Sequence, residues 1–283
     1  MISSILACTD GSSCSNVACD YAFRIAKALK TPVTGIHVLD VRLIEGPLLA
    51  DLSGAIGASG YFTGFAAFRQ LAEEKGSAIH QAFLDNAAQA GITPPPEFIL
   101  ETGHPLHLIL HHHKKDSLLV VGRCGENEPF GRGLIGSTTD RLIRHATSPC
   151  LVTPAKPRPI THILAACDDT PIAPAVAITA ASLAIHLNVP LTLLSVPVNM
   201  DHSETRQILL AAEVEAARHG SVTTKAIVRD GEPSDVILAT ATDEHCDLIV
   251  MGAHSHNRIR EWFVGCTTLR VLADSAMPAL LVR

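Results

Sequence analysis

The sequence predicts an α/β fold built from two doubly wound sandwiches, each with a five-stranded parallel sheet. Short runs rich in Val, Ile and Leu alternate with longer segments of helical periodicity, as expected for a parallel sheet covered by helices on both faces. This alternation occurs twice, and a proline-rich stretch, "TPAKPRPI" from Thr153, separates the two copies. Right-handed crossovers then give the strand order 3-2-1-4-5 in each half. A single barrel would require eight such units in one series, which the proline-rich break interrupts.

The elements follow from local signals. Asp10 and Ser12 form a turn at the start of the first long helix, Pro105 stands at the start of the third, and Ser137 at the start of the fourth. In the first half we expect strands near 3–9, 33–39, 97–102, 117–122 and 150–153, and helices near 15–29, 66–91, 105–114 and 137–146. In the second half we expect strands near 161–167, 191–196, 222–229, 247–251 and 279–282, and helices near 173–187, 203–219, 233–244 and 267–274.

The two halves are copies of one unit. Four segments recur in the same order, among them "ETGHPLHLIL" with "RDGEPSDVIL" and "DSLLVVGRCG" with "CDLIVMGAHS". We therefore expect domains at residues 1–154 and 160–283. The offset between the copies falls from 158 at Asp10 to 130 at Gly122, so the first half holds about 28 extra residues, around 42–70. This segment is rich in Gly and Ala and long for a loop, which leaves two interpretations, a lid over a ligand or a subunit contact.

Composition excludes several classes of function. Hydrophobic residues make up 47% of the chain and charged residues 18%, with a formal net charge of −6. That balance argues against nucleic-acid binding, which favours a basic face. No window approaches the roughly 18 uninterrupted apolar residues of a membrane helix, and the first residues lack the basic segment of a secretory signal. We therefore expect a cytoplasmic protein that binds neither nucleic acid nor membrane.

Cysteine and histidine raise the question of redox or metal chemistry. The eight cysteines are scattered without a CxxC pair, which predicts reduced thiols in cores and loops. Cys8 and Cys124 both border the crevice described below, where a redox pair is the alternative to two small structural residues. Cys266, at a predicted helix start, is a further candidate for a reactive thiol because a helix N-terminus lowers the thiol pKa. Consecutive histidines at 111–113 point about 100° apart on a helix, so we interpret them as a solvated helix end rather than a metal site.

Two polar loops point to one ligand site. Because strands 1 and 4 are neighbours in the predicted order, the loops that follow them meet where the strand order reverses. The first loop is "TDGS" from Thr9, and the second is "GRCG" from Gly122, followed by a helix that starts at Gly136 and Ser137. Glycines allow a backbone to approach a ligand closely, and the start of a helix presents N–H groups to an anion such as phosphate. Asp10 would accept from a ribose hydroxyl or hold Mg²⁺ through water.

A purely structural interpretation of both loops stays open at this stage. The sequence "STTD" at 137–140 satisfies a capping box, with Ser137 as the N-cap and Asp140 reaching back to it. In the same way, Asp10 and Ser12 are explained by a turn that caps the first helix. The spacing alone therefore does not decide between a helix cap and an anion site.

Together, "TDGS" after the first strand and "VVGRCG" followed by "GLIGSTTDRLIRHATSPCLV" resemble the universal stress protein family, whose nucleotide-binding members carry Gly-x2-Gly-x9-Gly-(Ser/Thr) after strand 4. The resemblance covers both halves and implies a tandem universal stress protein with an adenine nucleotide alpha hydrolase-like fold. It also implies ATP as the ligand. The residues that match the family's contacts are Thr9, Asp10 and Val38 at the adenine and ribose, Val121 and Gly122 beneath the nucleotide, and Gly125, Gly136, Ser137 and Thr138 at the phosphates.

The motif departs from the family pattern in both halves. Ten residues rather than nine separate Gly125 from Gly136, and we expect ATP binding to survive this insertion. In the second half, Ser255 stands in place of the second glycine and Cys266 in place of Ser or Thr. Asp169, after the first strand of that half, adds a carboxylate that would repel phosphate. We therefore predict that the second half binds ATP weakly or not at all.

Three functions fit the sequence. The first is an ATP-binding protein of stress response or signalling, with the nucleotide in the first half and the second half as a pseudo-symmetric partner. Members of the family commonly dimerise through strand 5, which implies that the two halves pair within the chain and that the chain forms a homo-oligomer. The second is a slow Mg²⁺-dependent ATPase, weak because no general base and no Arg or Lys clamp on a γ-phosphate is evident. The third is a nucleotide-free interaction scaffold.

Overall fold

The computed structural model describes residues 2–44, 47–125, 135–197, 207, 209–211, 213–214, 217, 223–253 and 264–283. The first half contains β1 (Ser4–Cys8), α1 (Ser13–Leu29), β2 (Val33–Asp40), α2 (Val41–Ile44), α3 (Pro47–Gln89), β3 (Glu97–Gly103), α4 (Pro105–His112), β4 (Ser117–Gly122), α5 (Ser137–His145) and β5 (Cys150–Thr153). The second half contains β6 (Ile163–Ala166), α6 (Ala173–Leu187), β7 (Leu191–Ser195), β8 (Thr224–Val228), α8 (Pro233–Asp243), β9 (Leu248–Gly252), α9 (Cys266–Asp274) and β10 (Ala279–Val282). All predicted strands are present close to their predicted bounds, while the helix expected near 203–219 lies largely outside the described residues.

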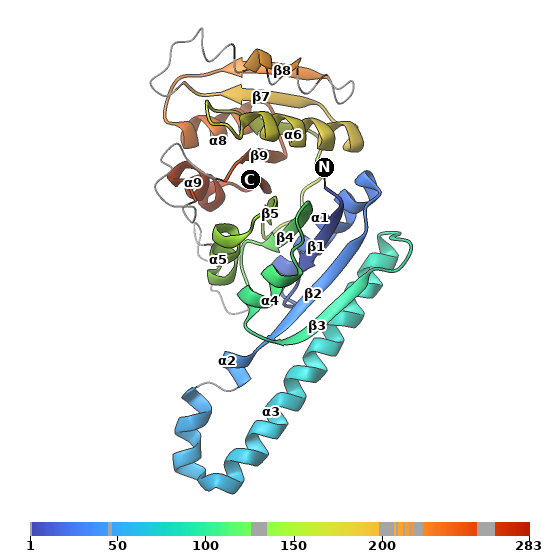
Figure 1. Ribbon diagram of the computed structural model, residues 1–283, viewed down its shortest axis with the longest axis vertical. Coiled ribbons are helices and arrows are strands. Elements are labelled where there is room, and N and C mark those ends of the chain that lie inside the picture. The colour runs from blue at the N-terminus through green and yellow to red at the C-terminus, as the bar shows by residue number, and fades with distance from the viewer. Residues whose placement is uncertain are drawn as a thin grey trace.

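The strands of both halves form one sheet of ten, in the order β3-β2-β1-β4-β5-β10-β9-β6-β7-β8 (Figure 1). Each half has the predicted order 3-2-1-4-5 with parallel neighbours. The halves meet at β5 and β10, which pair antiparallel with Leu280 opposite Leu151. The sequence predicted two sheets that pair through their fifth strands. The structure shows that this pairing uses backbone hydrogen bonds, so the two sheets become one.

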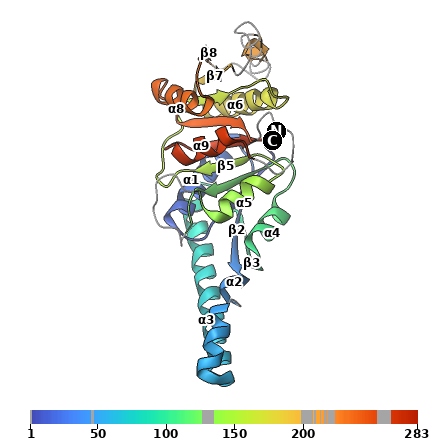
Figure 2. The ribbon, with the colours of Figure 1, turned by 90° about the vertical axis from the view of Figure 1, so that its left-hand side faces the viewer.

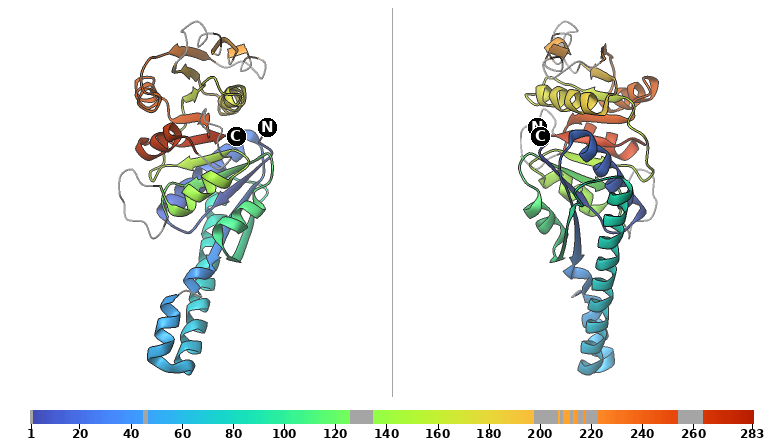
Figure 3. Two further views of the ribbon diagram at one scale, coloured as in Figure 1. Left: turned by 60° about the vertical axis from the view of Figure 1, so that its left-hand side comes forward. Right: turned by 90° about the vertical axis from the view of Figure 1, so that its right-hand side faces the viewer.

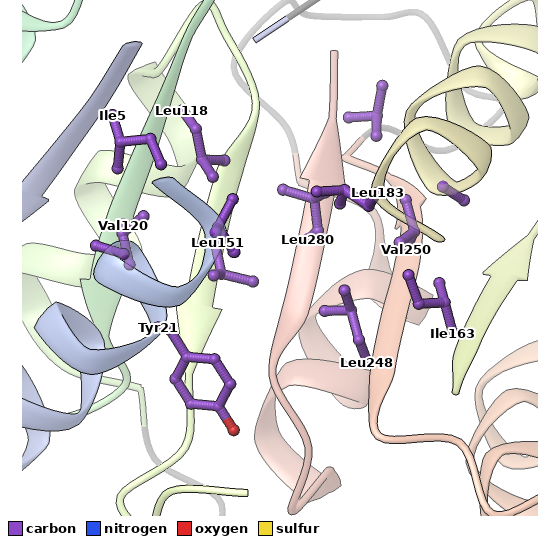
Figure 4. Close-up of a cluster of buried hydrophobic side chains, with 14 of the residues drawn as sticks. Ile5, Tyr21, Leu118, Val120, Leu151, Ile163, Leu183, Leu248, Val250 and Leu280 are labelled. Atoms are coloured by element: carbon purple, nitrogen blue, oxygen red, sulfur yellow. The ribbon is translucent and has the colours of Figure 1, made fainter. Parts of the chain in front are cut away.

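Helices cover both faces of the sheet (Figure 2). Alternate residues of a strand point to opposite faces. On β4, Leu118 and Val120 belong to a core that includes residues of α1, α3 and α6, whereas Leu119 and Val121 belong to a core that includes residues of α4, α5, α8 and α9. Each of these two cores runs through both halves, and Figure 4 shows side chains of one core on either side of the β5–β10 junction, among them Leu151 and Leu280. The central strands are therefore rigid supports for the loops that leave their carboxyl ends.

The segment inserted in the first half is helical. Within 42–70, the described residues 42–44 fall in α2 and residues 47–70 in the first part of α3, so the helix predicted near 66–91 starts much earlier than expected. The alanine content of the segment favours a helix. Figures 1 and 3 show α3 extending well beyond the sheet, while its last part packs on the core through Phe83 and Ala87. In the described part of the chain, no helix has both the length and the apolar character needed to cross a bilayer.

Candidate functional site

The loop that follows β1 holds Asp10 at the carboxyl end of the sheet. The Ser12 N–H donates to Asp10 Oδ1 at 2.9 Å, a side-chain turn that fixes the carboxylate. Gly11 has φ +80°, and a Cβ there would lie 2.9 Å from the Ile79 side chain, so glycine is required. Ser12 is the N-cap of α1 and accepts from the Ser15 N–H at 3.2 Å. The predicted cap is confirmed, and Asp10 lines the cavity described below.

Ser15 and His37 hold this loop in place. Ser15 Oγ donates to the Ser12 carbonyl at 3.0 Å and lies 3.2 Å from Thr9 Oγ1. His37 Nδ1 lies 2.7 Å from the Thr9 carbonyl oxygen, so this nitrogen carries the proton and donates. Both side chains are buried. Sequence reasoning missed both residues, although the spacing of Ser12 and Ser15 is typical of a helix start; His37, inside an apolar strand, gave no signal.

The helix α5 begins without a side-chain cap. Gly136 is its N-cap, and this residue has no side chain that could make a cap hydrogen bond. The Asp140 carboxylate, expected to reach back, instead accepts from Arg144 Nε and Nη2, each at 2.9 Å. The capping-box interpretation is therefore wrong, because an ion pair one turn along the helix engages the acid. The first-turn N–H groups of α5 have the arrangement of an anion site.

Two hydrogen bonds fix the start of α5 against the end of β4. Thr139 Oγ1 donates to the Gly122 carbonyl at 2.7 Å. The Gly136 N–H donates to the Arg123 carbonyl at 2.8 Å. Both ends of the glycine loop are thereby set, although residues 126–134, with the extra residue of the motif, lie outside the described residues.

Contacts within the protein leave little room for a side chain at Gly122 and Gly125. A Cβ at residue 122 would lie 3.0 Å from the backbone C and O of Cys14, so β4 runs too close to α1 for a side chain. A Cβ at residue 125 would lie 3.1 Å from Asp10 Oδ2. The prediction that these glycines make room for a ligand is therefore incomplete. These glycines also let the two loops approach each other.

The two loops border a cavity of about 630 Å³ at the carboxyl ends of β1, β2 and β4, a volume typical of small-molecule sites. Ile36 from β2 and Ile109 from α4 contribute apolar surface to it. The cavity lining includes every residue predicted as a ligand contact, namely Thr9, Asp10, Val38, Val121, Gly122, Gly125, Gly136, Ser137 and Thr138. The cavity thus combines an apolar wall with the N–H groups of a helix start.

The cavity is also lined by two cationic side chains that the sequence did not predict there. They are Arg42, after β2, and Lys75, on α3. Arg42 Nη2 lies 2.5 Å from Asp40 Oδ2. Burial alone would raise the pKa of Asp40, but its hydrogen bonds with Arg42 and the attraction of that cation lower the pKa overall. Lys75 follows the inserted segment, so its approach to the cavity depends on how α3 packs and not on a local motif.

The described residues contain no group of three or more His, Cys, Asp or Glu placed to hold a metal ion. His112 Nε2 lies 2.9 Å from Glu101 Oε1. His113 is buried beside the Ser117 carbonyl, and burial lowers its pKa. The prediction of a solvated helix end is therefore wrong for His113, because the chain turns inward after α4. The role of Asp10 toward Mg²⁺ stays a prediction.

Cys14 and Cys124 form a disulfide, which corrects the prediction of reduced thiols throughout and the alternative pairing of Cys124 with Cys8. The other six cysteines are free. Cys8 lines the cavity, but burial raises the pKa of its thiol well above the usual value, which makes it a poor nucleophile. Cys266 is exposed at the start of α9.

The second half repeats the frame of this site. Thr268 Oγ1 donates to the Gly252 carbonyl at 3.2 Å, matching the bond from Thr139 in the first half. Gly265 is the N-cap of α9, which begins with Cys266. Residues 254–263, which include Ser255, lie outside the described residues. Weak or absent nucleotide binding in this half stays a prediction.

Comparisons with known proteins agree with this architecture. A family model described as the universal stress protein family matches residues 1–154 and again residues 159–283. A universal stress protein from Synechocystis sp. is 28% identical over 290 residues, covering 99% of both chains. The crystal structure of a universal stress protein from Archaeoglobus fulgidus is similar with a TM-score of 0.74 and 18% identity, covering 100% of this chain and 99% of that one. A functionally unknown protein from Pseudomonas aeruginosa has a TM-score of 0.64 and 17% identity, covering 99% of this chain and 92% of that one. At these identities the two structures show the fold.

Proposed function

The chain belongs to the universal stress protein family, and on that premise we propose that its first half binds ATP in the cavity between β1, β4 and α5. We propose further that the protein acts in the cytoplasm, in stress response or signalling. One observation carries the proposal of ATP binding. The nine residues that the family resemblance implies as nucleotide contacts, although spread over four parts of the chain, all line one cavity.

The cavity offers distinct surroundings to the two ends of a nucleotide. Ile36, Val38 and Ile109 supply apolar surface for the adenine, and Asp10 supplies an acceptor for a ribose hydroxyl. The N–H groups at the start of α5 would receive the phosphates, where the helix dipole favours negative charge. Arg42, which is paired with Asp40, and Lys75 bring two cationic side chains to the cavity lining. A chain with a formal net charge of −6 therefore holds local features that suit a polyanion.

Mg²⁺ fits this arrangement as a companion of the nucleotide. Mg²⁺ in proteins is commonly held by one or two carboxylates, water and substrate phosphates. Asp10 is the carboxylate in the nucleotide loops that lines the cavity, so it would hold the ion through water. The ion would neutralise part of the phosphate charge.

The test is direct. Protein purified under native conditions is denatured, and released nucleotide is identified by ion-exchange chromatography; stripped protein is then titrated with ATP by calorimetry. We expect one ATP per chain. Two per chain would contradict the assignment of the second half, and neither carried nucleotide nor heat of binding would refute the proposal.

Hydrolysis is followed in the same preparation. ADP release with Mg²⁺ is measured for the wild type and for Ser137→Ala, which removes the hydroxyl at the start of α5. Turnover that this substitution lowers would favour the ATPase alternative. A rate that it leaves unchanged would exclude hydrolysis at this site.

A further inference from the structure

The Cys14–Cys124 disulfide joins the start of α1 to the loop after β4, beside the cavity. Cys14 is the second residue of α1, just after the Asp10 turn, and Cys124 lies between Gly122 and Gly125. Their Cα atoms are 5.8 Å apart, within the range of a disulfide. The bond therefore links the first turn of α1, which directly follows the Asp10 turn, to the loop after β4, across 110 residues of sequence.

The two sulfurs differ in their access to small molecules. Cys14 is 2% exposed, whereas Cys124 is partly exposed and lines the cavity. Thiol–disulfide exchange requires a thiolate to reach one sulfur of the pair. A small thiol would meet Cys124 from within the cavity, with Cys14 buried behind it as the resolving residue. A ligand that fills the cavity would cover the same approach.

We propose that Cys14 and Cys124 are a redox-active pair, which exchanges with small thiols and disulfides through the cavity, and that the disulfide strengthens ATP binding. The second part rests on the proposed function. The Cys124 thiolate attacks a small disulfide and releases one thiolate, leaving a mixed disulfide. The Cys14 thiolate then attacks the Cys124 sulfur and releases the second thiolate. Two electrons pass from the cysteines to the small disulfide, and the two cysteine protons end on the two small thiols.

The effect on ATP follows from what the bond fixes. The segment from Gly122 to Gly125 contains two glycines, which lose the most freedom on ordering. The Arg123 N–H already donates to the Thr153 carbonyl at 3.0 Å, so the start of the segment is held by β5. Gly125, which approaches Asp10, is held by the disulfide next to it. Ordering about one residue in advance of binding corresponds to an affinity roughly tenfold higher for the oxidised protein.

Coupling of this kind is reciprocal. If oxidation strengthens ATP binding about tenfold, saturating ATP must shift the quotient [GSH]²/[GSSG] at half-oxidation by the same factor, because each disulfide formed releases two glutathione thiols. The whole protein is equilibrated at fixed ratios of the two glutathione forms, with and without ATP, then alkylated and analysed by mass spectrometry. ATP affinity is measured separately by calorimetry on fully oxidised and fully reduced protein.

We expect a reversible Cys14–Cys124 disulfide and both tenfold effects. Cys14→Ser, which changes a residue outside the cavity lining, should bind ATP as the reduced wild type does, regardless of glutathione. Cys124→Ser should show no effect of glutathione on its ATP affinity. Cys266→Ser, which removes an exposed cysteine of the second half, should keep the redox effect. Thermal unfolding checks that each variant is folded. Cys14→Ser and Cys124→Ser should both lack the redox effect.

Three results would overturn the inference, and they are distinguishable. A pair that never exchanges with glutathione in the folded protein refutes the redox activity. Equal ATP affinity in both forms refutes the coupling while leaving the proposed function intact. ATP binding by neither form refutes both the coupling and the proposed function.

Discussion

Replacing Ser137 with Asp separates the stability of α5 from its use as an anion site. Ser137 is the first residue of the helix, where an acidic side chain stabilises the dipole by about 0.3–1 kcal/mol, so the variant should fold at least as stably. A phosphate held by the same turn would lie within about 5 Å, the pitch of one helical turn, of the new carboxylate. At an effective dielectric constant of about 20, two unit charges at that separation repel by about 3 kcal/mol. Solvent at the cavity mouth weakens the repulsion, so we expect ATP affinity to fall about 10- to 100-fold.

The assay is calorimetric titration with ATP and with adenosine. Adenosine lacks phosphates, so its affinity should change little. Cys266→Asp is the matched control, because Cys266 is the first residue of α9, the equivalent helix of the second half. A folded Ser137→Asp protein that binds ATP as tightly as the wild type would refute the placement of phosphates at α5.

Two further predictions concern stability. Arg123 donates to the Ala273 carbonyl at 3.4 Å and to the Ser275 carbonyl at the end of α9, so Arg123→Ala should destabilise the protein by about 1–3 kcal/mol in urea unfolding. Exposed Arg141→Ala is its control, and equal stability of both variants would contradict the contact between the halves. Burial lowers the pKa of His113 below its unfolded value of about 6.5. The unfolded chain then binds more protons between these two values, so this contribution to stability is present above about pH 6.5 and is lost as the pH falls toward the folded pKa. His113→Asn should reduce the change in the urea midpoint between about pH 7.5 and about pH 5. Exposed His111→Asn should leave that change as in the wild type. Identical pH profiles of the two variants would contradict this role of His113.

Local patterns were sufficient to predict the elements that depend on burial along one strand or helix. β4 is buried at every position, and its uninterrupted apolar run marked it clearly. The turn at Asp10 and the glycines after β4 were visible because backbone geometry restricts the residue types at such positions. Strand order then brought the two loops together, which is why the predicted contacts share one cavity.

Features that depend on three-dimensional packing could not be read in the same way. The partner of Cys124 lies 110 residues away, and only the approach of β4 to α1 selects Cys14 over Cys8. Asp140 had two suitable partners, its own helix start and Arg144, and the sequence does not rank them. Lys75 reaches the cavity because α3 packs across the sheet, which no short motif encodes.

The antiparallel junction of β5 and β10 has a consequence for how the two halves can evolve and function. Two separate copies would associate only above their dissociation constant, and diluting them would bare an apolar strand edge. One covalent chain makes that association unimolecular, at an effective concentration set by a short linker. The first half therefore keeps its partner at any abundance of the protein. The second half, kept in place by the linker, is free to change its own loops as long as β10 still pairs with β5.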